Sequence, residues 1–458
     1  MTLVNEATVA QVLAAADAAT DELIALHQEL VRIPTVNTGH MPTGGETVAC
    51  ALLADFFTRN DIPCETHESA PGRGNLIARI DGQTAHPSLL LMSHTDVVPV
   101  EDETVWTYPP FSGAIQDGKV WGRGSSDAKS LVSTGAMCLA LLRRHNIPLH
   151  GSLRFLAAAD EETGGEYGAG WVAEHLSDRI RADVALNEGA GGPLQTPGGL
   201  VFSIANGEKG RYEVHITVRG KSGHAAAPWR SDNALHQLAD VLQRILAYQP
   251  ELNTAHPTFA AMAALYRLSE TPTAANIDRL AAELPPDDEL AASLLRATSR
   301  MTLTPTMVHA GLKSNSIPAA ASLTCDVRTL PHQDAAYVHN QVVRLLHGIP
   351  RVEIRVVSTA ISTASAFDTP FLDACTRAVG VATGRPDATL LPTLTGGFTD
   401  SRFFRPLGTK VYNFMPSHVT ADTRNSGVHG VDENIEIAAL RARLRFMVAL
   451  AVDYLGEG

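Results

Sequence analysis

A short apolar run that ends in polar residues is the feature that most constrains this chain. Residues 89–92 are all apolar, and the sequence SHTD follows at once at residues 93–96. Such a run is typical of a buried strand in a parallel sheet, and ligands of open α/β sheets bind at the carboxyl ends of the strands. Because side chains alternate along a strand, His94 and Asp96 point the same way. They indicate either a metal ligand with its supporting carboxylate or a solvated turn.

The flanking sequence predicts an α/β domain. Apolar strands are expected at 75–80, 88–93, 152–159 and 184–187, and helical spacing is found at 46–59, 129–145 and 166–176. Strands that alternate with helices predict a mostly parallel sheet flanked by helices. The same pattern resumes after Phe371 and closes with a helix expected at Glu433–Tyr454.

The middle of the chain has a different character. Residues 212–219, 306–310 and 321–328 alternate apolar and polar side chains, which is typical of half-exposed antiparallel strands. Helices are expected between them, and residues 250–300 form an Ala-rich stretch of helix and loop. We therefore predict a small α+β domain at 207–357, inserted into an α/β domain formed by residues 1–206 and 358–458.

Composition excludes several classes of protein. The 458 residues are too many for one ordinary core, and the formal net charge of -13 argues against a nucleic-acid surface. The sequence contains no run of 18 apolar residues, so we expect no membrane span. The first residues lack the basic start and apolar block of a signal peptide, so we do not expect export. The five cysteines are scattered and never form a CxxC pair, so we expect reduced thiols in a cytoplasmic protein.

Further acidic residues fall where predicted strands end. Glu161 and Glu162 follow the strand SLRFLAAAD, and Glu188 follows VALN. Asp127 lies between a glycine-flanked loop and a helix, and His429 lies in SGVHGVDEN. Taken singly, each has an ordinary structural interpretation as well as a functional one: Glu161 and Glu162 could lie in a solvated acidic loop, Asp127 could be a helix N-cap, and His429 could be a structural histidine.

Taken together, these residues suit a pair of metal ions. Oxygen-rich sites with one histidine per metal fit two Zn²⁺ ions, which share a bridging carboxylate and a bridging water. Five protein ligands serve two ions if one carboxylate bridges, and the remaining Glu can take a proton from the water. The pattern predicts a metallohydrolase in which a metal-bound hydroxide attacks an amide or similar carbonyl.

Eight motifs extend this interpretation along nearly the whole chain: SHTDVVP, GRGSSDAK, DEETGG, NEG, GKSGHAAAP, KSNSIPAAASLTCDVR, TGGFTDSRF and VHGVDE. In this order they resemble the di-zinc aminoacylase, glutamate carboxypeptidase and succinyl-diaminopimelate desuccinylase family of metallopeptidases and deacylases. Several independent motifs in one order are far more specific than any single motif.

The resemblance implies roles for individual residues around two Zn²⁺ ions, with Co²⁺ or Mn²⁺ as substitutes. Asp127 would bridge the ions, Asp96 would hold the imidazole of His94, and Glu161 would be the general base and later the acid. The remaining ligands would be His94 and Glu188 on one ion, and Glu162 and His429 on the other.

The inserted domain would then be a lid and dimerisation domain. His224 would stabilise the developing oxyanion, within its own chain or across a homodimer, and Arg328 would bind a substrate carboxylate. Asn315 and Arg328 are expected on neighbouring strands. Gly396 and Gly397 would line the substrate pocket through backbone groups.

Two departures from the family pattern stand out. Many relatives place an acidic residue after the bridging Asp, where this chain has Ala128, and the second position is FTDSRF, where relatives commonly place a Thr-Ser or Thr-Asp step. The family often has a cis peptide at the first position. We therefore hypothesise a cis bond between Asp127 and Ala128, which costs about 3–4 kcal/mol in a non-proline pair unless the surroundings hold it.

The leading hypothesis is a zinc-dependent carboxypeptidase or dipeptidase that cleaves an amide bond next to a free carboxylate in a small peptide. The alternative is an N-acyl-amino-acid deacylase of the same family. A non-catalytic dimeric metal-binding protein would lack the base or a ligand, and all are present here. The Gly-rich stretches lack the GxGxxG fingerprint of a nucleotide-binding protein.

Overall fold

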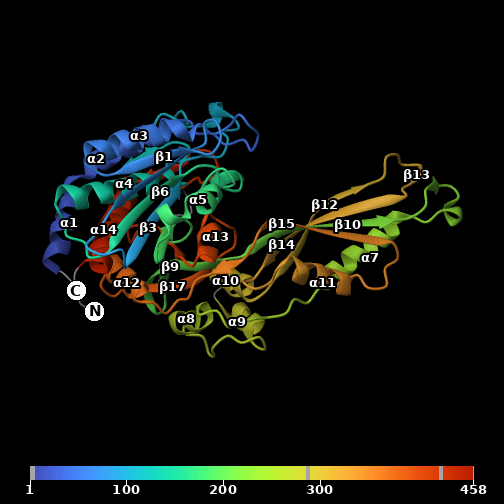
Figure 1. The fold of residues 1–458 in the computed structure, drawn as a ribbon. Helices are drawn as coiled ribbons and strands as arrows, with labels where there is room; N and C mark the ends of the chain where they lie inside the picture. The colour runs from blue at the N-terminus through green and yellow to red at the C-terminus, as the bar shows by residue number, and fades with distance from the viewer. Residues whose placement is uncertain (1–5, 285–288, 422–425, 457–458) are drawn as a thin grey trace. The chain divides into compact units, whose positions relative to one another are not determined.

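The computed structural model describes residues 6–284, 289–421 and 426–456. The chain forms two compact units, which we describe separately (Figure 1). The first unit comprises residues 1–206, 365–392 and 399–458, and the second comprises residues 207–364 and 393–398. The second unit begins where the predicted insertion begins and extends beyond the expected end at 357.

A twisted sheet forms the centre of the first unit. Its middle strands are parallel, and antiparallel strands complete it on either side, so the predicted α/β class with a mostly parallel sheet is confirmed. In sheet order the strands are β1 (Cys64–Glu68), β2 (Gly74–Ile80), β6 (Ser152–Ala158), β3 (Ser88–His94), β7 (Val184–Asn187), β18 (Lys410–Asn413) and β9 (Gly199–Glu208), and β8 (Pro193–Thr196) and β17 (Thr389–Thr395) also pair with β9. The last two residues of β9 belong to the second unit, where they pair with β16 (Thr363–Ala364).

The strand β3 is buried along its whole length, as the central strand of a two-sided sheet must be. Helices cover both faces of this sheet (Figure 1). One apolar core joins the sheet to α1 (Glu6–Ala18), α2 (Thr20–Val31), α3 (Glu46–Arg59), α4 (Lys129–Arg144), α12 (Pro370–Thr383) and α14 (Ile437–Leu455). The opposite core joins it to α5 (Ala169–His175), α6 (Ser177–Ile180) and α13 (Ser401–Phe404). Each fully buried Leu or Phe contributes about 1.5–3 kcal/mol to such cores.

A small three-stranded sheet lies beside the candidate site residues of the first unit. It consists of β4 (Ala114–Gln116), β5 (Lys119–Trp121) and β19 (Asn434–Glu436). The expected closing helix at Glu433–Tyr454 is therefore wrong at its start. Residues 434–436 pair with β5, and the helix begins only at Ile437. A pairing between segments so far apart in the chain leaves no local pattern in the sequence.

The second unit is built on a four-stranded antiparallel sheet. Its strands, in order, are β12 (Thr302–Ala310), β14 (Ala320–Thr329), β10 (Gly210–Arg219) and β15 (Val352–Ala360). The alternating residues of β10 and β14 are buried on one face against α7 (Ala234–Leu246) and α11 (Ala335–Leu345). A separate two-stranded sheet pairs β11 (Gly223–His224) with β13 (Ser316–Ile317).

The Ala-rich stretch at 250–300 is helical, as predicted. It contains α8 (Thr258–Leu265), α9 (Ile277–Glu283) and α10 (Glu289–Ser299), and residues 285–288 lie outside the described part of the chain. Lys209 is buried beneath α10, and its Nζ donates to the carbonyls of Ala297 and Arg300 at 2.8 Å each. No helix among the described residues has the length and apolar character that a membrane span requires.

The cysteines fit the expectation of free thiols. All five lie in the described part of the chain without a disulfide, and four of them are buried. Burial raises the pKa of the Cys138 thiol well above its usual range and that of Cys50 to about 12. These thiols therefore act as small apolar side chains within the cores.

Candidate functional site

The carboxyl ends of three neighbouring strands bring the predicted acidic residues together. In the register of the sheet, His94 at the end of β3 lies opposite Ala158 at the end of β6. Asp160–Glu162 follow β6 directly, and Glu188 follows β7 on the other side of β3. Because parallel strands end at the same edge, residues distant in sequence meet here.

His94 lies between two carboxylates. Its Nε2 is 3.3 Å from Asp127 Oδ1 and 3.3 Å from Glu188 Oε2, and its imidazole is almost fully buried. Its Nδ1 is 3.0 Å from the carbonyl oxygen of Asp96, an acceptor that fixes the ring proton on Nδ1. Nε2 is then left with the lone pair that a metal ion requires, directed at the two carboxylates.

His429 makes the matching contact on the other side of Asp127. Its Nε2 is 3.2 Å from Asp127 Oδ2 and 3.2 Å from Glu162 Oε2. The two oxygens of Asp127 therefore face one imidazole each. The ligand atoms of each trio lie within 4.8 Å of one another, and the trios share Asp127.

The charges of the cluster fit divalent cations. Hydrogen bonds to Asp127 and Glu162 raise the pKa of His429 to about 10, and burial raises the pKa of Glu188 to about 7. Both shifts show that the site holds positive charge strongly and tolerates further negative charge poorly. Two imidazole nitrogens and carboxylate oxygens from three residues form a donor set suited to zinc and similar ions.

Asp96 links the two halves of the site. Its carboxylate lies 3.3 Å from His94 Nδ1, and it accepts hydrogen bonds from the backbone N–H of Glu161 at 3.1 Å and of Glu162 at 3.2 Å. The side chain of Asn37 donates to it at 2.8 Å. One buried carboxylate thus orients both an imidazole and the turn that carries the two glutamates.

Glu161 lies beside the cluster on the 3-10 turn Glu161–Thr163. Desolvation and the nearby charge of Glu188 raise the pKa of its carboxyl well above the ordinary value. Asp400, in the FTDSRF motif, is 2% exposed, and burial raises its pKa as well. The motif was noted in the sequence as a departure from the family pattern, but no role was predicted for Asp400.

The loop that carries Asp127 depends on a residue that sequence reasoning missed. The carboxylate of Glu433 accepts hydrogen bonds from the backbone N–H groups of Gly124, Ser126 and Asp127, each at 2.9 Å. It also pairs with Arg123 Nη1 at 2.7 Å. Glu433 is part of the VHGVDE motif, and that motif was the only feature of the sequence from which a role for Glu433 could have been predicted.

The peptide bond between Asp127 and Ala128 is cis. The hypothesis drawn from the sequence is therefore confirmed. Ala128 is fully buried and precedes α4, whose residues 129–142 are all buried.

The remaining predicted residues lie in the second unit. His224 is exposed on β11, and the N–H of Ala225 donates to the carbonyl of Asn315 at 3.1 Å, so His224 and Asn315 are neighbours. Gly396 and Gly397 lie in the bend after β17, and a side chain built at either position would meet open space.

Arg328 lies on β14, and the expectation that Asn315 lies on a neighbouring strand is wrong. Asn315 lies in the turn before β13, which pairs only with β11 among the described strands. Arg328 Nε donates to Asp326 Oδ1 at 2.7 Å, and Nη2 donates to Oδ2 at 3.3 Å. Its Nη1 donates to the carbonyl of Gly396 at 2.9 Å, so these two predicted residues do meet.

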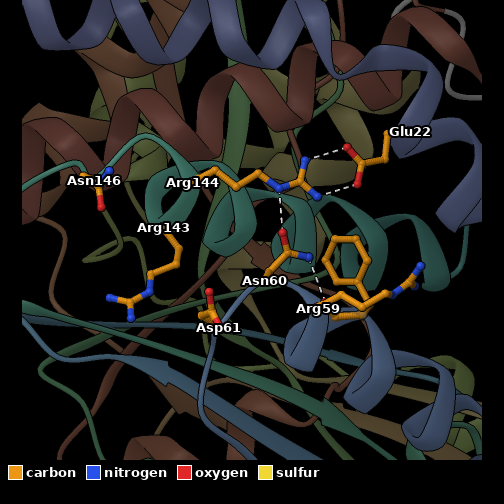
Figure 2. A pocket seen from close by; sticks show the side chains of 8 residues that line it. Glu22, Arg59, Asn60, Asp61, Arg143, Arg144 and Asn146 are labelled. Atoms are coloured by element: carbon orange, nitrogen blue, oxygen red, sulfur yellow. Dashed lines mark hydrogen bonds and ion pairs between the residues drawn. The ribbon is translucent and has the colours of Figure 1, made fainter.

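A surface pocket of about 510 Å³ lies elsewhere in the first unit (Figure 2). Arg144 is bound there by both carboxylate oxygens of Glu22, at 2.5 and 2.6 Å, and by Asn60 Oδ1 at 2.5 Å. None of the described residues that line it belongs to the cluster around Asp127. We therefore assign the chemistry to the strand ends rather than to this pocket.

Comparison with known proteins identifies the family to which the chain is similar. Residues 90–453 match the family described as Peptidase family M20/M25/M40. The chain is 29% identical over 421 residues to a succinyl-diaminopimelate desuccinylase of Maricaulis maris, and the match covers 90% of each protein. It is 35% identical over 239 residues to the corresponding enzyme of Methylorubrum extorquens, a match that covers 51% of this chain and only 59% of that enzyme.

Solved structures share the fold. An M20 family metallo-carboxypeptidase of Sulfolobus solfataricus has a TM-score of 0.69 at 18% identity, covering 94% of this chain and 99% of the other. A dinuclear metal binding peptidase of the M20 family from Bacillus subtilis has a TM-score of 0.61 at 16% identity, covering 96% and 99%.

The contacts of Glu433 generate a first prediction. In Glu433→Gln, one acceptor oxygen replaces two and Arg123 loses its charge partner, so the loop around Asp127 loosens. Supporting residues of this kind typically change metal affinity by about 10–100-fold. We expect a loss of that size in isothermal titration with Zn²⁺, together with a lower melting temperature. Glu436→Gln, on the strand β19 that follows Glu433, serves as the control, and equal affinities in the two variants would contradict the role of Glu433.

Proposed function

As a member of the peptidase family M20/M25/M40, the chain is a hydrolase that acts on C–N bonds, and we propose that it cleaves an amide bond next to a free carboxylate. The observation that carries the proposal is the pair of donor trios that share Asp127, with Glu161 beside them. Small peptides are one class of substrate, which makes the enzyme a carboxypeptidase or dipeptidase.

A second candidate is an N-acyl-amino-acid deacylase. Two relatives at 29% and 35% identity are named succinyl-diaminopimelate desuccinylases, and their names describe the removal of an acyl group. The likeness to the solved carboxypeptidase rests on 18% identity and supports the fold alone. The sequence relatives therefore favour the deacylase, and the ligand set suits both reactions.

Two divalent cations, for which we propose Zn²⁺, would be held by His94 and Glu188 on one side and by Glu162 and His429 on the other, with Asp127 between them. When bound, such ions polarise a carbonyl and lower the pKa of water. The imidazoles must be neutral to bind them, and the contact between Asp96 and His94 Nδ1 favours the required tautomer.

Glu161 is the residue that moves the proton. Its carboxyl has a raised pKa, which suits a group that accepts a proton from the attacking water and then donates it to the leaving nitrogen. Its backbone N–H is fixed by Asp96, so its position is set independently of the substrate. We assign no metal ligand role to Glu161.

The second unit supplies the substrate contacts in this proposal, as a lid and dimerisation domain. His224 is exposed, and its Nδ1 accepts a hydrogen bond from the N–H of Ala226 at 3.1 Å, which leaves Nε2 to stabilise the developing oxyanion. Arg328 would bind the substrate carboxylate, and Gly396 and Gly397 would line the pocket through backbone groups.

The role of Glu161 is tested by substitution. Glu161→Gln keeps the shape of the side chain and removes its basicity, so turnover should fall by about 10²–10⁴-fold while metal content is retained. The measurement is kcat together with elemental analysis of the purified variant. The exposed Glu166, on the same loop, gives a matched control as Glu166→Gln. Turnover near the normal rate in Glu161→Gln would remove it from the role of base.

The role of His224 is tested in the same way. His224→Ala should lower kcat by about 10²–10³-fold, as expected for the loss of an oxyanion donor, with both metal ions and the melting temperature unchanged. His236→Ala, an exposed histidine on α7, is the control. A kcat equal to that of the control would exclude His224 from the reaction.

Metal dependence and substrate class are tested on the unaltered protein. We expect about two zinc equivalents per chain by elemental analysis, and hydrolysis that a chelator abolishes and Zn²⁺, Co²⁺ or Mn²⁺ restores. A panel of dipeptides and N-acyl amino acids, each with and without its free carboxylate, distinguishes the peptidase from the deacylase. Protein that binds no metal after reconstitution would contradict the proposed site.

A further inference from the structure

The turn that carries Glu161 and Glu162 is held from several distant parts of the first unit. Asp160 begins it in the left-handed backbone region, with φ at 67°, a conformation that is unfavourable for a non-glycine residue. Gly165 closes it with an N–H that donates to the carbonyl of Asp160 at 2.6 Å. The turn therefore needs contacts from outside to hold it in this conformation.

The carboxylate of Asp160 provides those contacts. Its Oδ1 accepts hydrogen bonds from Arg73 Nη2 at 2.7 Å, Asn37 Nδ2 at 3.1 Å and Thr163 Oγ1 at 2.7 Å. Its Oδ2 accepts from the N–H of Tyr167 at 2.9 Å. Both ends of the turn and two remote side chains thus meet on a single carboxylate.

Asn37 connects this carboxylate to the rest of the site. Its Nδ2 lies 2.8 Å from Asp96 Oδ2 as well as 3.1 Å from Asp160 Oδ1, and the residue is 2% exposed. Asp96 in turn holds His94 and the N–H groups of the turn. A short chain of buried bonds therefore runs from the imidazole of one donor trio to the turn that carries Glu162 of the other.

Arg73 supplies the positive charge of this network. Its side chain is fully buried, and its Nη2 lies 3.1 Å from Glu46 Oε1 and 2.7 Å from Asp160 Oδ1. One guanidinium thus faces two carboxylates that lie next to the proposed metal site. Without it, Asp160 would be an uncompensated buried charge beside further acids, a costly arrangement.

We propose that Arg73 and Asn37 are positioning residues for the reaction: they fix the Asp160–Gly165 turn so that Glu161 and Glu162 are held at the proton-transfer and metal-binding positions. The inference rests on the proposed function, because it gives the turn its role. The two ions should not be affected equally. Loosening the turn affects the ion held by Glu162 and His429, whereas the ion held by His94 and Glu188 is retained.

A purely structural role for Arg73 would have a different signature. Breaking a buried ion pair destabilises a fold strongly wherever the pair lies. The chain offers a matched control in Arg377, whose Nη2 lies 2.7 Å from the buried Asp453 and which joins α12 to α14. Arg377→Met should lower the melting temperature and leave kcat and both metal affinities unchanged.

The test compares Arg73→Met, Arg73→Lys and Arg377→Met by calorimetric titration of the metal-free full chain with Zn²⁺, by melting temperature and by separate measurement of kcat and KM. In Arg73→Met we expect one of two zinc affinities to fall by about 10–100-fold, the size typical of residues that support a ligand. Its kcat should fall while KM stays within about twofold. Because only Nη2 of Arg73 contacts the carboxylates, the single ammonium of Arg73→Lys should restore part of both losses.

Two ligand variants identify which ion is affected. The titration of Arg73→Met should match His429→Ala, which removes a ligand of the ion that Glu162 holds, and should differ from His94→Ala. Asn37→Ser, which keeps the charges, provides a second variant in case Arg73→Met does not fold. It should show the same selective loss in smaller measure.

The outcomes separate the two proposals. If the unaltered chain binds two ions and both affinities survive in Arg73→Met and Asn37→Ser, the positioning role is overturned and the proposed function stands. A variant that loses both ions in proportion to its melting temperature, as a structural defect would, overturns it as well. Failure of the unaltered chain to bind metal contradicts the proposed function itself.

Discussion

The shared carboxylate of Asp127 is the interaction on which the site depends. One oxygen lies 3.3 Å from His94 Nε2 and the other 3.2 Å from His429 Nε2, and each imidazole has a second carboxylate beside it. Acids crowded at a sheet edge repel one another unless positive charge lies among them. Protons on the imidazoles provide that charge in one state, and cations provide it in the other. The raised pKa of His429, about 10, means that a cation must displace a strongly held proton there.

The main sheet positions two of the proposed metal ligands, and loops position the others. Parallel strands bring His94 and Glu188 to one edge, but Asp127 and His429 come from loops outside the main sheet. Glu433 holds the first of these loops through three backbone N–H groups, and β19 brings Glu433 there by pairing with β5. The small three-stranded sheet therefore helps to position Asp127, the proposed shared ligand, through Glu433.

Sequence reasoning succeeded where a local pattern reports a local structure. The apolar run at 89–92 predicted a buried strand, and His94 lies at its end. It failed where the structure depends on contacts between distant segments. It assigned no role to Glu433 or Arg73, because their partners lie far away in the chain, and it wrongly placed Asn315 on a strand beside that of Arg328. The strand β9 was missed, and the predicted domain boundary between residues 206 and 207 falls within it.

The contacts of Arg328 suit the proposed role of this side chain in binding a substrate carboxylate. A guanidinium carries five N–H donors, and Asp326 and the carbonyl of Gly396 engage three of them here. One N–H therefore remains on each terminal nitrogen, which is the number that a two-point contact with a carboxylate needs. Asp326 meanwhile compensates the charge of Arg328 when no substrate is bound. These contacts hold the guanidinium of Arg328 in one orientation, so that binding a carboxylate would require little reordering of the side chain.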